Sequence, residues 1–347
     1  MKKVSISILL VLILSSILTG CHTKTSTKTN LNQNSLSEQK KLTIGFSIDT
    51  LAIERWQRDL DVFINKAKEL GADVIVQNAG NNLEEQNRQL TYLLDRNVDV
   101  IVVLPKKADG FSETIQKIRN KNIPVIAYDR LILGTEVDLY ITINSKAVGE
   151  LMGNKMRQIS KGPNWYCILG AEEDYNMTLV KQGIQDAIIH TPFKIGHTFY
   201  ADAWNYDLAY NEMVRLISNE DIPDAIICGN DAVADSVLLA LNTYYTGPHI
   251  PICGQDADIA ACQNIVNGKQ DFSIFKPITK LAEVTAEIAV RMAKGEDTKD
   301  ITGGQVINNS AAEIPVLWLE PKLVDITNLD EIVIDSGFHT HAEVYRN

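Results

Sequence analysis

The strongest restriction on the fold is a regular alternation of short apolar segments with amphipathic ones. Val98–Leu104 is almost wholly apolar, which is typical of a strand in a parallel sheet covered on both faces. The segment before Gly71 places Trp56, Leu60 and Phe63 on one stripe, which indicates a helix that ends at the glycine. We expect strands at residues 42–48, 74–76, 98–104 and 124–128, with helices at 56–70, 83–94 and 111–118 between them. Because crossovers between parallel strands are right-handed, this run predicts a doubly wound sheet.

A second run of the same alternation begins near residue 165. Strands are expected at 165–169, 195–200, 225–228, 250–253 and 272–275, with helices at 177–189, 208–217, 233–241, 259–266 and 278–293. The length of 347 residues also suits two domains. We therefore predict an α/β protein of two similar doubly wound lobes, and the surplus elements after residue 272 suggest that the chain crosses between them more than once.

The N-terminus predicts the compartment. Lys2 and Lys3 precede an apolar run interrupted only by serines, as in a secretory signal peptide at residues 1–20. Leu18-Thr-Gly-Cys21 resembles the bacterial lipobox, in which the cysteine receives a diacylglyceryl group, so Cys21 is the expected lipidation site. The alternative is an ordinary signal peptide that happens to contain a cysteine. Residues 22–40 hold twelve Ser, Thr, Asn or Gln among nineteen, which predicts a flexible tether over 21–40. Together these features predict a lipid-anchored protein on the extracytoplasmic face of the cell membrane.

The charge balance excludes one class of partner. The formal net charge is −11, and removing residues 1–20 with their two lysines makes it −13. A nucleic-acid-binding protein needs a basic face to neutralise phosphates, so we expect no nucleic acid partner.

Polar residues gather just after the expected strands. Asp49 follows the first strand, Asp129-Arg130 follow the fourth, and the second run adds Asn230-Asp231, Gln255-Asp256 and Lys276. In open α/β sheets, ligands bind beyond the carboxyl ends of the strands, so these side chains should face one another across a cleft between the lobes. The sequence contains neither of the glycine-rich motifs that bind phosphate groups, G-x-x-x-x-G-K-S/T and G-x-G-x-x-G. The carboxylates, amides and guanidinium groups found here can instead form hydrogen bonds with the hydroxyl groups of a neutral polyol.

Each of these residues also has a structural interpretation. Asp231 is expected to be the N-cap of the helix that follows it, and Asp256 and Asp258 could cap the helix that begins near Ile259. Asp129-Arg130 could form a surface ion pair, Trp56 could pack in the core, and Lys276 could be a solvated loop residue. The pattern as a whole, rather than any one member, favours a binding site.

Four blocks in order are similar to one family of known proteins. They are Glu54-Arg-Trp-Gln57, Ala127-Tyr-Asp-Arg130, Gly254-Gln-Asp-Ala-Asp258 and Lys276-Pro-Ile-Thr279. They resemble the D-xylose-binding members of the pentose (ribose-type) family of type I periplasmic sugar-binding proteins, and the likeness runs from about residue 42 to 338. The resemblance implies two Rossmann-like lobes joined by a three-strand hinge. On this basis we assign residues 41–145 and 277–309 to an N-terminal lobe, and 146–276 and 310–347 to a C-terminal lobe.

The resemblance also implies a role for each site residue. Arg55, Asp129 and Arg130 would bind the sugar hydroxyls from the first lobe. Trp56 and Trp204 would stack on the two faces of the ring, because the C–H faces of a pyranose are weakly apolar. The remaining polar contacts would come from Asn176, Asn230, Asp256 and Lys276. The stretch after Asp49 departs from the family pattern, which leaves the preferred sugar open.

We therefore predict a receptor for D-xylose or a related pentose that closes on one monosaccharide and delivers it to the membrane permease of an ABC importer. The alternative is a subunit that senses D-xylose and signals through a membrane histidine kinase of a two-component system. We find no catalytic constellation, no metal-ligand cluster and no cofactor loop in the sequence, so we expect a binding protein without cofactor rather than an enzyme.

Overall fold

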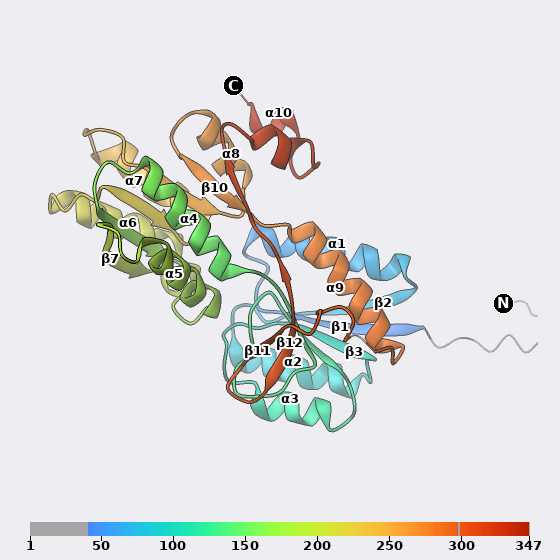
Figure 1. The fold of residues 1–347 in the computed structure, drawn as a ribbon. Helices are drawn as coiled ribbons and strands as arrows, with labels where there is room; N and C mark the ends of the chain where they lie inside the picture. Colours follow the sequence, from blue (N-terminus) through green and yellow to red (C-terminus); the bar gives the residue numbers. More distant parts are fainter. Residues whose placement is uncertain (1–40, 298, 347) are drawn as a thin grey trace, which may run out of the picture. The chain divides into compact units, whose positions relative to one another are not determined.

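The computed structural model describes residues 41–297 and 299–346. The predicted signal peptide, the lipidation site at Cys21 and the tether lie outside these residues. The described part contains two sheets (Figure 1), a seven-stranded one in the order β11-β12-β5-β4-β3-β1-β2 and a six-stranded one in the order β13-β10-β9-β8-β6-β7. Within each sheet every pairing is parallel except that of an edge strand, β11 or β13. The predicted fold class, two α/β lobes, is confirmed.

Helices cover both faces of the first sheet. Its strands are β1 (Leu42–Ile48), β2 (Ala72–Asn78), β3 (Val100–Leu104), β4 (Val125–Tyr128), β5 (Leu139–Ile143), β11 (Val306–Asn308) and β12 (Glu313–Leu319). Its helices are α1 (Glu54–Glu69), α2 (Leu83–Asp95), α3 (Ser112–Arg119) and α9 (Ile278–Ala293). Val100 and Val102 of β3 join the core under α1 and α9, whereas Ile101 and Val103 join the core under α2 and α3. This alternation is why the strand is apolar along its whole length.

The second lobe repeats this arrangement. Its strands are β6 (Asn164–Leu169), β7 (Lys194–Tyr200), β8 (Ala225–Cys228), β9 (Ile252–Gln255), β10 (Phe272–Phe275) and β13 (Lys322–Asp325). Its helices are α4 (Ser145–Ile159), α5 (Tyr175–Ile188), α6 (Tyr206–Ser218), α7 (Asp231–Tyr244), α8 (Ile259–Val266) and α10 (His341–Val344), with short helical turns at Asp202–Trp204 and Asp330–Ile334. Cys167 of β6 packs with the core that includes α5, and Ile168 packs with the core that includes α6 and α7.

Three crossings of the chain connect the lobes. The chain passes from β5 to α4, returns from β10 to α9, and leaves again from β12 to β13. Two crossings touch: the Asn144 N–H donates to the Leu319 carbonyl at 2.9 Å, and Asn144 Nδ2 lies 3.3 Å from Glu320 Oε1. Since β12 pairs with β5, residues 313–319 belong to the first sheet, although the sequence-based boundary at 310 assigned them to the second lobe. The third crossing therefore comes about ten residues later than expected.

Candidate functional site

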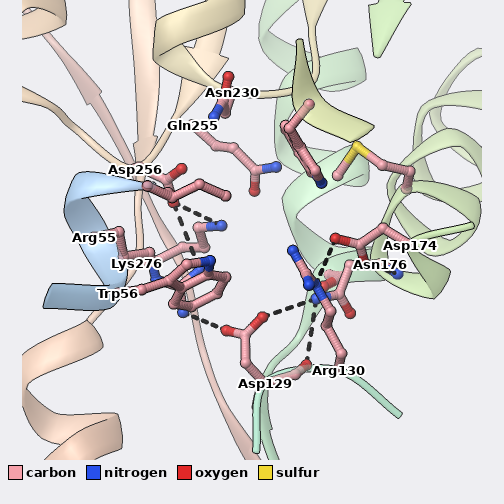
Figure 2. A pocket seen from close by; sticks show the side chains of 14 residues that line it. Arg55, Trp56, Asp129, Arg130, Asp174, Asn176, Asn230, Gln255, Asp256 and Lys276 are labelled. Atoms are coloured by element: carbon pink, nitrogen blue, oxygen red, sulfur yellow. Dashed lines mark hydrogen bonds and ion pairs between the residues drawn. The ribbon is translucent and has the colours of Figure 1, made fainter. Parts of the chain in front are cut away.

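The two lobes face each other across a cavity at the carboxyl ends of their strands. The space between the lining residues that no atom fills is about 410 Å³, part of it open to solvent. All nine side chains predicted from the sequence line it: Arg55, Trp56, Asp129, Arg130, Asn176, Trp204, Asn230, Asp256 and Lys276. Gln255, one of the polar residues expected after the strands, lines it as well. Four further lining residues were not singled out from the sequence: Ile53, Ser145, Asp174 and Met177. Figure 2 shows these side chains converging from both lobes.

The first lobe contributes a buried ion pair. Arg55 lies in the first turn of α1, and Asp129 directly follows β4. The Arg55 guanidinium donates to the Asp129 carboxylate, and both side chains are almost wholly buried. Burial alone would raise the pKa of Asp129, but the charges of Arg55, Lys276 and Arg130 outweigh it and lower that pKa. Asp129 is therefore a carboxylate at neutral pH.

Arg130 connects the lobes. Its Nη1 donates to Asp49 Oδ2 at 2.5 Å within the first lobe, and its Nε lies 2.7 Å from Asp174 Oδ2 of the second lobe. Burial raises the pKa of Asp49, and the Arg130 charge offsets part of this effect. Sequence analysis noted Asp49 as a polar residue after a strand and gave no role to Asp174.

The second lobe contributes a second ion pair and an amide. Lys276 Nζ lies 2.7 Å from Asp256 Oδ1, at ion-pair distance but outside hydrogen-bond alignment. Asn176 Nδ2 donates to Asp129 Oδ1 at 3.0 Å, so it already binds a residue of the opposite lobe. The structure thus groups acceptors and donors from both lobes within one ring, as Figure 2 shows.

Asn230, rather than Asp231, is the N-cap of α7. Its Oδ1 accepts from the Val233 N–H at 2.8 Å, so this oxygen serves the helix while the residue lines the cavity. Asp231 instead turns inward and accepts hydrogen bonds from Ser273 and Gln270. The capping role expected for Asp231 was wrong by one position, because α7 begins at Asp231 itself, two residues before the expected start at residue 233.

Two tryptophans line the cavity with free indole donors. Nε1 of Trp56 and Nε1 of Trp204 are buried and have no hydrogen-bond partner among the described residues. The Arg55 guanidinium lies 4.4 Å from the centre of the Trp56 ring, a cation–π contact. The Trp204 ring rests against Gly170, where a Cβ atom would come within 2.3 Å of the ring, so only glycine fits there. A buried N–H needs an acceptor, and a hydroxylated ligand would supply it. Sugar stacking by either ring stays a prediction.

Three lining residues have strained backbone. Asp129, Trp204 and Asp256 have φ values of 62°, 58° and 104°, in the left-handed region that favours glycine. Such strain persists only where the surroundings hold it, and it gathers at functional sites. Sequence periodicity carries no signal for this feature.

Further observations restrict the chemistry of the described residues. No helix among them is long and apolar enough to cross a membrane. Within 41–297 and 299–346, no three His, Cys, Asp or Glu side chains are grouped as a metal would require.

Comparisons with known proteins give the family. Residues 44–297 match the model of the periplasmic binding protein domain. The chain is 36% identical over 317 residues to the D-xylose-binding periplasmic protein of Haemophilus influenzae, covering 90% of this chain and 95% of that protein. It is 34% identical to the protein of the same name from Escherichia coli, with the same coverage.

A solved structure agrees in fold. An ABC transporter solute-binding protein of Clostridium phytofermentans, with bound β-D-glucose, superposes with a TM-score of 0.80 at 27% identity, over 87% of this chain and 99% of that one. These relatives are binding proteins, in agreement with the prediction that the chain is not an enzyme. With two facing α/β lobes, a cavity between them and a family match over most of its length, the chain belongs to the periplasmic binding proteins, among relatives of the D-xylose-binding type.

Proposed function

We propose that the protein is an extracytoplasmic, lipid-anchored receptor for D-xylose or a related pentose, which closes on one monosaccharide and delivers it to the permease of an ABC importer. The observation that carries the proposal is the cavity itself. Charged and amide groups of both lobes converge on it, and two buried indole N–H groups there have no partner among the described residues. A polyol that donates and accepts hydrogen bonds around an apolar ring suits both features.

The relatives support the choice of sugar and of transport. Two of them are named for D-xylose binding, and the solved neighbour is described as part of an ABC transporter. The residues that the resemblance assigned to sugar contact all line this cavity. The lipid anchor is supported by the lipobox-like sequence that ends at Cys21.

Isothermal titration calorimetry with D-xylose, D-ribose, L-arabinose, D-galactose and D-glucose tests the proposal. We expect saturable one-to-one binding of D-xylose and much weaker binding of the other sugars. Asp256→Asn should weaken D-xylose binding by at least about tenfold, because it removes the charge that pairs with buried Lys276. The matched control is Asp335→Asn, which changes an exposed carboxylate of the same lobe and should leave the affinity unchanged.

The other outcomes each contradict a part of the proposal. Tighter binding of another sugar would contradict the xylose assignment while leaving the cavity as the site. If none of the five sugars binds, the scaffold is shared with the relatives and the ligand is not. Wild-type affinity in Asp256→Asn would remove Asp256 from the site.

A further inference from the structure

The turn that carries Asp256 is strained at two successive residues. Asp256 has a φ of 104° and Ala257 a φ of 53°, and neither is a glycine. A side chain makes this backbone region unfavourable, so the surrounding structure must hold the turn in place. The orientation of the Asp256 carboxylate toward the cavity depends on that support.

Three successive backbone N–H groups of this turn, at residues 256–258, donate hydrogen bonds to neighbouring elements. The successive N–H groups of residues 256–258 donate to the Ile274 carbonyl at 2.9 Å, to Ser273 Oγ at 3.2 Å and to Asp231 Oδ2 at 3.0 Å. Ser273 Oγ is itself 2.7 Å from the Asp231 carboxylate. Strand β10 and the first residue of α7 therefore fix one side of the turn.

The other side is held by the C-terminal segment. His339 Nε2 lies 2.8 Å from the Ala257 carbonyl oxygen, and His339 is only 4% exposed. Because a carbonyl can only accept, Nε2 must carry the hydrogen in this bond. The bond reaches back over 82 positions of sequence to the residue next to Asp256.

The segment around His339 is itself firmly packed. The Phe338 ring meets the Phe275 ring edge-on at 5.0 Å, and the Arg58 guanidinium of α1 lies 4.5 Å from the centre of the Phe338 ring. Figure 1 shows α10 beside α8, and Gln263 of α8 donates to the Glu343 carbonyl at 2.7 Å. His339 therefore acts from a fixed position.

We propose that His339 is a positioning residue for sugar binding: by holding the Ala257 carbonyl it fixes the strained turn that aims Asp256 into the cavity. The proposal rests on the proposed function, because it gives His339 an effect on the sugar affinity of that site. His339 does not line the sugar cavity, although it shares a smaller neighbouring cavity with Arg55 and Asp256. Its printed hydrogen bond goes to the turn, so the turn is the route that we propose for its effect.

The test is calorimetry of the protein with D-xylose, paired with thermal unfolding without sugar. His339→Ala should weaken D-xylose binding about five- to tenfold, as expected from the loss of one buried hydrogen bond. His339→Gln keeps an N–H donor and should bind closer to wild type than the alanine variant does. In an Asp256→Asn background the change at His339 should have less effect, since the group it positions is already altered.

Val344→Ala is the matched control. Val344 is buried in the same C-terminal segment, so its truncation should lower the melting temperature without changing the affinity. Equal affinities for wild type and His339→Ala would overturn the proposal, as would equal losses in His339→Ala and Val344→Ala at matched melting temperatures. If His339→Ala fails to fold, His339→Leu, which fills the space without an N–H donor, takes its place: a loss of affinity in His339→Leu that His339→Gln does not share supports the positioning role, whereas wild-type affinity in His339→Leu contradicts it. If wild type itself fails to bind D-xylose, the proposed function fails instead.

Discussion

Asp59 is a buried carboxyl group one helical turn beyond Arg55. Its Oδ2 accepts from the Tyr128 hydroxyl at 2.6 Å and lies 3.7 Å from Arg55 Nη2. Burial raises the pKa of Asp59 from 3.8 to about 7, because the Arg55 charge and the Tyr128 hydrogen bond offset only part of the desolvation. In the unfolded chain this carboxyl ionises near its ordinary pKa.

The raised pKa makes stability depend on pH. Between about pH 4 and 7 the folded protein holds a proton on Asp59 that the unfolded chain has lost, so the contribution of Asp59 to the free energy of unfolding falls as the pH rises. Asp59→Asn does not titrate. The free energy of unfolding of wild type minus that of the variant, from urea denaturation, should therefore fall by up to about 4 kcal/mol across this window. A difference independent of pH would contradict the raised pKa.

The sequence predicted which residues line the cavity better than it predicted which of them contact one another. The strand-end rule and the resemblance together identified ten of the lining residues, because parallel strands bring their carboxyl ends to one edge. They did not reveal that Arg130 lies between Asp49 and Asp174, since this contact joins loops of two lobes. Ion pairs between the lobes depend on how the two lobes are oriented, and the local sequence patterns used to predict strands and helices carry no information about that orientation.

At the scale of elements, the closest packing in the second lobe is between α4 and α5. A Cβ atom on Gly149 would come within 2.0 Å of the Val180 carbonyl oxygen, and one on Gly183 within 2.1 Å of the Lys146 carbonyl oxygen. The two backbones are therefore in direct contact. Sequence analysis found no helix at α4, which contains two glycines, whereas it found α5, which contains one; each glycine lowers helix propensity.

Gly149→Ala tests this contact. Alanine favours the isolated helix by about 1 kcal/mol, so a variant without a clash would be stabilised. We expect the opposite, a fall of about 1–3 kcal/mol in the free energy of unfolding, since the helices would have to separate. Asn154→Ala, at an exposed position of α4, serves as the control and should change stability by less than about 0.5 kcal/mol. A stabilised Gly149→Ala protein would refute the close approach.

Other elements were missed for equally physical reasons. Proline has no backbone N–H to donate within a sheet, so an apolar segment that contains it is a poor candidate for an inner strand. Pro315 lies inside β12, which is why this strand was not predicted. In the structure β12 is second from the edge, and Pro315 pairs with Val306 of the short edge strand β11. Long apolar strands such as β3 were placed to within two residues.

At the scale of the whole molecule, an ion pair outside the sugar cavity joins the two lobes. Lys106, which follows β3, lies 2.7 Å from Glu173, which follows β6, and both side chains are partly exposed. The pair exists only when the lobes are close together, so it should favour the closed arrangement. In the proposed function, closure brings residues of both lobes onto the sugar, and a more populated closed form would raise the apparent affinity.

Lys106→Ala and Glu173→Ala should therefore each weaken D-xylose binding by up to about fivefold, the range of a partly exposed pair. The double variant should be little worse than either single one, and 1 M salt should reduce the differences. Lys117→Ala is the control, because Lys117 pairs with Glu113 within α3 at 2.6 Å and should not affect binding. Additive losses in a double-mutant cycle followed by calorimetry would show that the two side chains do not act together.

The three crossings have a consequence for the order in which the chain can fold. Neither lobe is a continuous stretch of sequence: α9, β11 and β12 complete the first sheet and its cover only after the second lobe has been made as far as β10, and β13 comes later still. During synthesis the first sheet therefore stays unfinished until about residue 319 has emerged, and the second until about residue 325. A chain cut short before residue 313 lacks a strand of each sheet, so we expect both lobes to be completed only late in synthesis.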